Sequence, residues 1–100
     1  MDTLGDVLHR TVEGYAGRAL NGYSYFMSNA DRHVFAIVSV GRVRDRHIVD
    51  TGLVARLAGD RIIIERDVND KPLVDALVQA GVPRGQIVLV YAGESAEEAA

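Results

Sequence analysis

The spacing of hydrophobic positions changes after the first sixteen residues of the chain. Up to that point apolar side chains recur at steps of three and four, as on one face of an α-helix. The stripe consists of Leu4, Val7, Leu8, Val12, Tyr15 and Ala16. Thr3 and Asp6 have the spacing of a capping box, with Asp in place of the usual Glu, and Gly17 suits a helix end. The pattern predicts an N-terminal helix over residues 3–16.

The next part of the chain reads as strands. Residues 23–28 alternate, with Tyr23, Tyr25 and Met27 on one side. Residues 34–40 are almost wholly apolar, which is typical of a central strand. From His47 to Leu57 the odd positions are expected to form one face of a long strand. "AGDR" at 58–61 has the chemistry of a tight hairpin, and "IIIE" follows it as the fourth strand.

The stretch "DVNDKPLVDALVQAG" predicts a second helix. Asn69 is the expected N-cap, with Asp70 in the first turn and Pro72 early enough to be tolerated. Gly81 suits the left-handed position after the helix, and Pro83 prevents the helix from continuing. "QIVLV", residues 86–90, is continuously apolar and predicts a last strand that is buried on both faces.

The predicted fold is therefore α+β: an N-terminal helix, a four-stranded antiparallel meander, a second helix and a C-terminal buried strand. We expect one domain over residues 1–93 and an acidic, disordered tail over residues 94–100. A chain of 100 residues, 48% of them hydrophobic, suffices for one core.

Composition and charge exclude several kinds of site and of protein. The absence of cysteine rules out disulfides and thiolate metal sites. The N-terminus does not resemble a signal peptide, and no apolar run is long enough for a membrane span, so we expect a soluble, cytoplasmic protein. The net charge of −3 is unevenly distributed: residues 32–66 carry seven Arg and four acids, and the rest carries four bases and ten acids. This excess of acids argues against a protein that binds DNA phosphates over its whole surface.

Candidate chemistry is sparse. The three histidines fall on different predicted elements, without metal-ligand spacing. "GYAGRALNG" lacks the Lys and the strand–loop–helix context of a phosphate loop, and we interpret it as a connector. Glu65 and Asp67 are expected on one face at a strand end, and catalysis there would need further converging groups. We predict no catalytic, cofactor-binding or metal-binding residues, no cofactor and no enzymatic activity.

Two groups of residues remain as candidate partner-binding sites. Arg42, Arg44 and Arg46 alternate, so they point one way if their segment is extended. They act either as charges that keep an edge soluble or as a docking patch for acidic groups or phosphates. Tyr23, Tyr25 and Met27 form either part of the core or an interface, where Tyr and Met are enriched.

The order of these motifs resembles the XisI-like family, which is named for a factor that controls excision of the fdxN DNA element. The resemblance runs from about Leu4 to Tyr91 and is densest in "GDRIIIERDVND" and "LVDALVQAGVPRGQIVLV". The first of these includes the expected helix cap, Asn69 and Asp70. The closing motif falls on Gly81, Val82, Pro83, Ile87, Val88 and Leu89. In the first half, the family's Asp, Tyr and Val-Gly-Trp resemble Asp31 to Arg42.

The sequence departs from the family at three places. The family's Gly-Trp is Gly41-Arg42 here, its aromatic in the fourth strand is Ile63, and its Asp-Gly turn is Gly59-Asp60.

The resemblance implies a small α+β fold and a non-enzymatic accessory or regulatory protein. Family members commonly occur beside XisH-type proteins, which look like nucleases, so we expect this chain to bind such a partner. The alternative is direct nucleic-acid binding through the Arg-rich segment 42–46. We also expect a homodimer, because so apolar a sheet in so short a chain leaves surface to cover.

Overall fold

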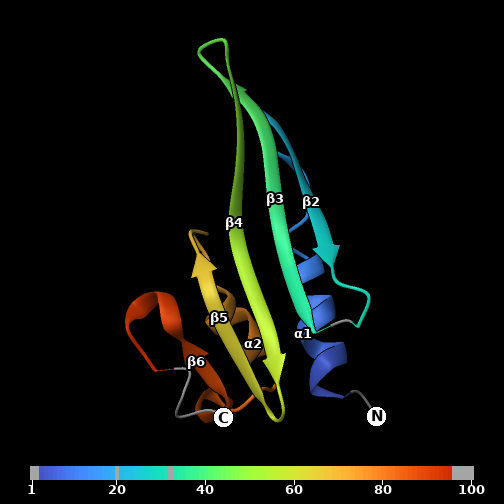
Figure 1. Ribbon diagram of the computed structural model, residues 1–100, viewed down its shortest axis with the longest axis vertical. Coiled ribbons are helices and arrows are strands. Elements are labelled where there is room, and N and C mark those ends of the chain that lie inside the picture. Colours follow the sequence, from blue (N-terminus) through green and yellow to red (C-terminus); the bar gives the residue numbers. More distant parts are fainter. Residues whose placement is uncertain (1–2, 20, 32, 96–100) are drawn as a thin grey trace.

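The computed structural model describes residues 3–19, 21–31 and 33–95. Within these ranges the chain forms an α+β fold in which two helices and a six-stranded mixed sheet enclose the core. Figure 1 shows both helices behind the sheet, on the same face. The elements are α1 (Leu4–Glu13), β1 (Gly17–Ala19), β2 (Gly22–Ser28), β3 (Val34–Val43), β4 (Arg46–Ala58), β5 (Arg61–Asp67), α2 (Leu73–Gln79) and β6 (Ile87–Leu89).

The capping box of α1 is confirmed. Thr3 Oγ1 accepts a hydrogen bond from the Asp6 backbone N at 3.1 Å, and the Thr3 backbone N donates to Asp6 Oδ2 at 3.2 Å. The helix buries Leu8 and Val12 completely. It ends at Glu13, three residues earlier than predicted. The two apolar residues beyond it, Tyr15 and Ala16, pack on the core from outside the helix, so their spacing extended the helical pattern too far.

The sheet has the order β1-β2-β3-β4-β5-β6, with β1 to β5 antiparallel and β6 parallel to β5. The predicted four-stranded meander therefore lacked one strand. In β1, Gly17 pairs with Ser24 of β2, and Ala19 pairs with Gly22. This pairing lies in the stretch that we interpreted as a connector. Three residues that include a glycine are too few to show an alternating pattern.

Two bulges turn side chains to faces that the alternation does not predict. The pairing of β3 with β4 shifts by one residue at Gly52, so Thr51 and Leu53 lie on opposite faces of the sheet. The prediction of one face for all odd positions from His47 to Leu57 is therefore wrong. A second shift falls at Glu65, between the pairs Val54–Arg66 and Ala55–Ile64. It separates Glu65 from Asp67, which were expected on one face.

The N-cap of α2 differs from the prediction. The helix begins at Leu73 with Pro72 in the N-cap position, and Pro72 has no capping side chain. The carboxylate of Asp67 serves instead: Oδ2 accepts from the Leu73 backbone N at 2.6 Å, and Oδ1 accepts from the backbone N and Nδ2 of Asn69. Asn69 therefore donates to the capping group and is not the cap itself.

The end of α2 is as predicted. Gly81 has a positive φ of 102°, and its backbone N donates to Val78 O at 3.0 Å. The Val82 backbone N donates to Leu77 O at the same distance, which completes a Schellman motif. Val82 and Leu77 are both buried, so this turn joins the core.

The core lies between the helices and one face of the sheet. Its buried members are Leu8, Val12, Phe35, Ile37, Leu53, Ala55, Ile62, Ile64, Leu73, Val74, Leu77, Val82 and Ile87. In β6 only Ile87 is buried, whereas Val88 and Leu89 are partly exposed. β6 lies at the edge of the sheet, so the prediction of burial on both faces is wrong.

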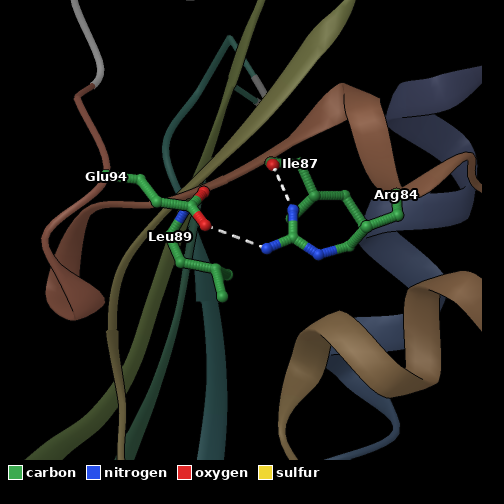
Figure 2. Close-up of polar contacts among 4 residues, drawn as sticks. All are labelled: Arg84, Ile87, Leu89 and Glu94. Atoms are coloured by element: carbon green, nitrogen blue, oxygen red, sulfur yellow. Dashed lines mark hydrogen bonds and ion pairs between the residues drawn. The ribbon is translucent and has the colours of Figure 1, made fainter.

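Side chains close the outer edge of β6 (Figure 2). Arg84 Nη1 donates to Ile87 O at 2.8 Å, and the Leu89 backbone N donates to Glu94 Oε1 at 2.8 Å. Arg84 Nη2 and Glu94 Oε2 form an ion pair at 3.0 Å. Glu94, which the sequence analysis placed in the tail, is thus bonded to β6; residues 96–100 of that tail lie outside the described ranges.

Candidate functional site

The upper halves of β3 and β4 form a projecting arm, which we define as residues 38–51 (Figure 1). β5 pairs with β4 only from Leu53 to Ala58, so the arm extends beyond the last strand pair on that side. Arg44 and Asp45 make the turn at its tip with φ values of 51° and 64°. Positive φ at both central residues of a two-residue loop defines a type I′ hairpin, which matches the twist of the strands.

The arm determines where the three candidate arginines lie. Arg42 pairs with His47, Arg46 pairs with Val43, and Arg44 lies in the turn between them. Because the chain reverses at Arg44, the segment is not extended and the three side chains do not share one face. All three are exposed, and together they make the tip of the arm basic.

Tyr23, Tyr25 and Met27 lie on the sheet face opposite the helices. Their neighbour Phe26 points the other way, against the rings of His9 on α1 and Phe35. The exposed fractions are 44% for Tyr23, 49% for Tyr25 and 53% for Met27, so the interpretation as core is wrong.

These residues belong to a larger apolar surface. Tyr23 and Tyr25 pair in register with Val40 and Val38 on the same face, and Val40 pairs in turn with Val49, which is 60% exposed. We call this surface the open-face patch; it consists of Tyr23, Tyr25, Met27, Val38, Val40 and Val49. Lower on the same face, Ile63 is fully buried and the Arg56–Glu65 ion pair spans 2.8 Å. The patch is therefore confined to the part of the sheet above these residues.

The opposite face of the arm carries a shallow groove of about 280 Å³, between the start of β2 and the arm. Gly22, Gly41, Val43, Ile48 and Asp50 are among its lining residues. Close approach of the backbones forms its floor, because a Cβ on Gly22 would lie 1.9 Å from Val40 O. The lining is mostly apolar, unlike a pocket with converging polar groups.

Titratable groups are dispersed over the described residues. Glu65 pairs with Arg56, and Asp67 faces the start of α2. Among residues 3–19, 21–31 and 33–95, no three His, Asp or Glu side chains gather as ligands for a metal ion. None of the helices in these ranges is long and apolar enough to cross a membrane.

Sequence reasoning missed the free edge of β4 beside the arm. β4 pairs with β3 on one side from Arg46 to Arg56, but on the other side its pairing with β5 begins only at Leu53. The residue pattern showed a long strand from His47 onwards. It carried no signal of where the next strand stops pairing.

These features define a small α+β protein whose prominent surfaces are an exposed apolar patch and a basic hairpin tip. The chain belongs to the XisI family, because the family model described as XisI protein matches residues 6–99. The resemblance inferred from the sequence is thereby confirmed. A search of curated proteins gave no match.

Two solved structures, both from Anabaena variabilis ATCC 29413, share the fold. One is a XisI-like protein, with a TM-score of 0.64 and 19% identity over 86% of this chain and 78% of that one. The other is the fdxN element excision controlling factor XisI, with a TM-score of 0.64 and 15% identity over 96% of this chain and 94% of that one. The likeness therefore covers nearly the whole domain.

Proposed function

We propose that this protein is a non-enzymatic regulatory subunit that acts by binding a nuclease-like protein of the XisH type. The family to which it belongs supports this role, since one of its structural neighbours is an excision controlling factor. In this role the protein works in the cytoplasm, where such a partner meets DNA.

The open-face patch is the observation that carries the proposal. Monomeric soluble proteins rarely leave contiguous apolar surface uncovered, and Tyr and Met are enriched where proteins meet. Tyr23 and Tyr25 also lie against each other, with ring centroids 4.8 Å apart, so they offer a rigid aromatic surface. Arg42 and His47 follow on the same face toward the tip, where Arg42 adds a positive charge at the rim. The partner surface expected here is apolar with acidic groups at its margin.

The test is co-expression with an XisH-type protein, followed by affinity capture. We expect Tyr25→Ser and Met27→Ser to reduce the captured partner at least tenfold, because they remove central apolar anchors. Val78→Ser is the matched control: Val78 is 44% exposed on α2, on the other side of the molecule. If the wild-type pair co-purifies no better than unrelated proteins, the proposal fails.

The arm favours direct nucleic-acid binding as a second candidate function. Its tip brings three exposed arginines within one hairpin turn, and guanidinium groups suit bidentate contact with phosphate. Such binding weakens steeply with salt, and the slope falls by about one for each lost phosphate contact. Replacing Arg42, Arg44 and Arg46 by Ala should then flatten the salt dependence. A wild-type chain that leaves labelled DNA and RNA unshifted at low salt would exclude this function.

A further inference from the structure

The edges of the sheet differ in how they are protected. β1 exposes only three residues, Gly17–Ala19. At β6, Arg84 donates a hydrogen bond to the carbonyl of Ile87, and Glu94 accepts one from the backbone amide of Leu89. The side of β4 that faces away from β3 is unpaired from Arg46 to Thr51. Exposed strand edges of this length are templates for pairing with another chain.

The register shows which backbone groups face outward at this edge. Val43 and Arg46 close a two-residue hairpin and so form a hydrogen-bonded pair. By alternation, Ile48 and Asp50 also direct their backbone groups to β3, whereas His47, Val49 and Thr51 direct theirs outward. Thr51 O accordingly accepts from Arg66 Nε at 2.6 Å. The groups left for a partner strand are those of His47 and Val49.

We propose that two copies of this chain pair antiparallel through Arg46–Asp50, with Ile48 of both copies on a two-fold axis. The segment reads Arg-His-Ile-Val-Asp and is self-complementary in this direction. Arg46 of each copy lies opposite Asp50 of the other, and Ile48 lies opposite Ile48. Opposite charges in directly facing positions stabilise a strand pair, and a shared two-fold axis requires one self-complementary surface.

The hydrogen-bond pattern is compatible with this register, and the facing charges distinguish it from its neighbour. With Ile48 on the axis, His47 of one copy and Val49 of the other form an outward-facing hydrogen-bonded pair on each side of the axis. The bond from Arg66 to Thr51 O is preserved. A neighbouring register that also matches outward-facing groups places Val49 on the axis. Its hydrogen bonds would need the Thr51 carbonyl, which already accepts from Arg66. It would also set Arg46 opposite Gly52. It therefore loses both charge pairs.

The side chains of this segment are available for such contacts. Ile48 is 42% exposed and Val49 is 60% exposed. Asp50 contacts Arg66 only at 3.5 Å, and its side chain is half exposed, so it has room for a second cation. Ile48 and Asp50 also line the groove of the arm, which this pairing would extend into the second copy. The inference goes beyond the proposed function, because it concerns an edge and leaves the open-face patch uncovered.

Charge reversal tests the interface. Arg46→Asp sets like charges opposite each other twice in a homodimer, and so does Asp50→Arg; each should raise the dimer dissociation constant about tenfold or more. Mixing the two variants restores both opposite-charge pairs, so the mixture should form a heterodimer. Arg44→Asp is the control, because Arg44 lies in the turn outside the paired segment. Sedimentation velocity at micromolar concentration measures the association, and circular dichroism verifies folding.

The outcomes are distinct. A wild-type dimer, weakened in each single variant and restored in the mixture, supports the interface. A wild-type chain that sediments only as a monomer overturns it, as does a dimer that neither reversal weakens. Met27→Ser, which targets the open-face patch, should leave the dimer intact. If it abolishes the dimer instead, self-association uses the patch and the edge is not the interface. Since partner capture is measured separately, failure here is distinguishable from failure of the proposed function.

Discussion

Asp67 Oδ2 accepts a hydrogen bond at 2.6 Å from the backbone N of Leu73, six residues later. The end of β5 and the start of α2 are thereby joined through one carboxylate. Leu73 N is the first helical amide and has no acceptor within its helix. The same carboxylate holds the connecting turn through Asn69. Asp67 therefore fixes how α2, with its buried Leu73 and Leu77, meets the sheet.

Replacing Asp67 by Ala should lower the free energy of unfolding by about 1–2 kcal/mol, because it removes a helix cap and the acceptor of the turn. Asp70→Ala is the matched control. Asp70 is exposed three residues later, and its replacement should change the free energy by less than about 0.5 kcal/mol. Urea unfolding of both variants measures the difference. Equal losses would show that Asp67 is not the cap.

This cap also shows what the sequence could predict and what it could not. The helix, its end at Gly81 and the strand before it were predicted, because each rests on local spacing or on backbone conformation. Asn69 and Asp67 are both competent to cap. The choice between them depends on the shift at Glu65, which turns Asp67 toward the helices. Such a shift follows from pairing between distant strands and leaves no local signal.

The candidate site was predicted to a similar extent. Tyr23, Tyr25 and Met27 were correctly placed on one face, but alternation does not say which face the helices cover. The three arginines were expected to point one way along an extended segment, but the chain reverses at Arg44 and Asp45. Neither residue is Asn or Gly, the usual markers of a type I′ turn.

Gly22 should tolerate no larger side chain, because its backbone lies very close to that of β3. A Cβ there would lie 1.9 Å from Val40 O and 2.6 Å from Gly41 Cα, and backbone atoms cannot rotate away. Gly22→Ala should therefore cost about 1–3 kcal/mol or more in the free energy of unfolding. Gly85→Ala is the control, since a Cβ on Gly85 meets open space. Thermal and urea unfolding of the two variants provide the comparison, and equal stability would contradict this close approach of the two backbones.

Tyr15 should make stability depend on alkaline pH. Its hydroxyl donates to Lys71 O at 2.8 Å; burial, followed by the charges of Asp67 and Asp75, raises the pKa of Tyr15 from 10.0 to about 12. Between these values the unfolded chain releases the proton while the folded chain keeps it. The free energy of unfolding should therefore decrease as pH rises from about 10 toward 12.

Tyr15→Phe removes this titration, so its stability should depend less on pH in the same window. Tyr91, whose pKa burial also raises, remains in both proteins and does not contribute to the difference. Urea unfolding followed by far-UV circular dichroism at several alkaline pH values measures both slopes. Parallel slopes would show that the folded state does not favour the protonated form of Tyr15.

Glu94 should protect the backbone of β6 from solvent. Its carboxylate accepts from the Leu89 backbone N and pairs with Arg84, and these contacts, Leu89 first, lower the pKa of Glu94 below its ordinary 4.5. The carboxylate therefore remains charged, and the contact persists, until the pH falls through this lowered value. Glu94→Ala should speed hydrogen exchange of the Leu89 amide about tenfold near neutral pH, since one hydrogen bond to a charged group is lost.

Glu13→Ala is the control for this measurement. Glu13 is an exposed acid on α1, 3.9 Å from His9 Nε2 and far along the chain from β6. Exchange detected by NMR should give the same Leu89 rate in this variant as in the wild type. If the Leu89 amide exchanges equally fast with and without Glu94, then the edge is protected by something other than this carboxylate. The β6 edge would then not differ from the β4 edge through this carboxylate.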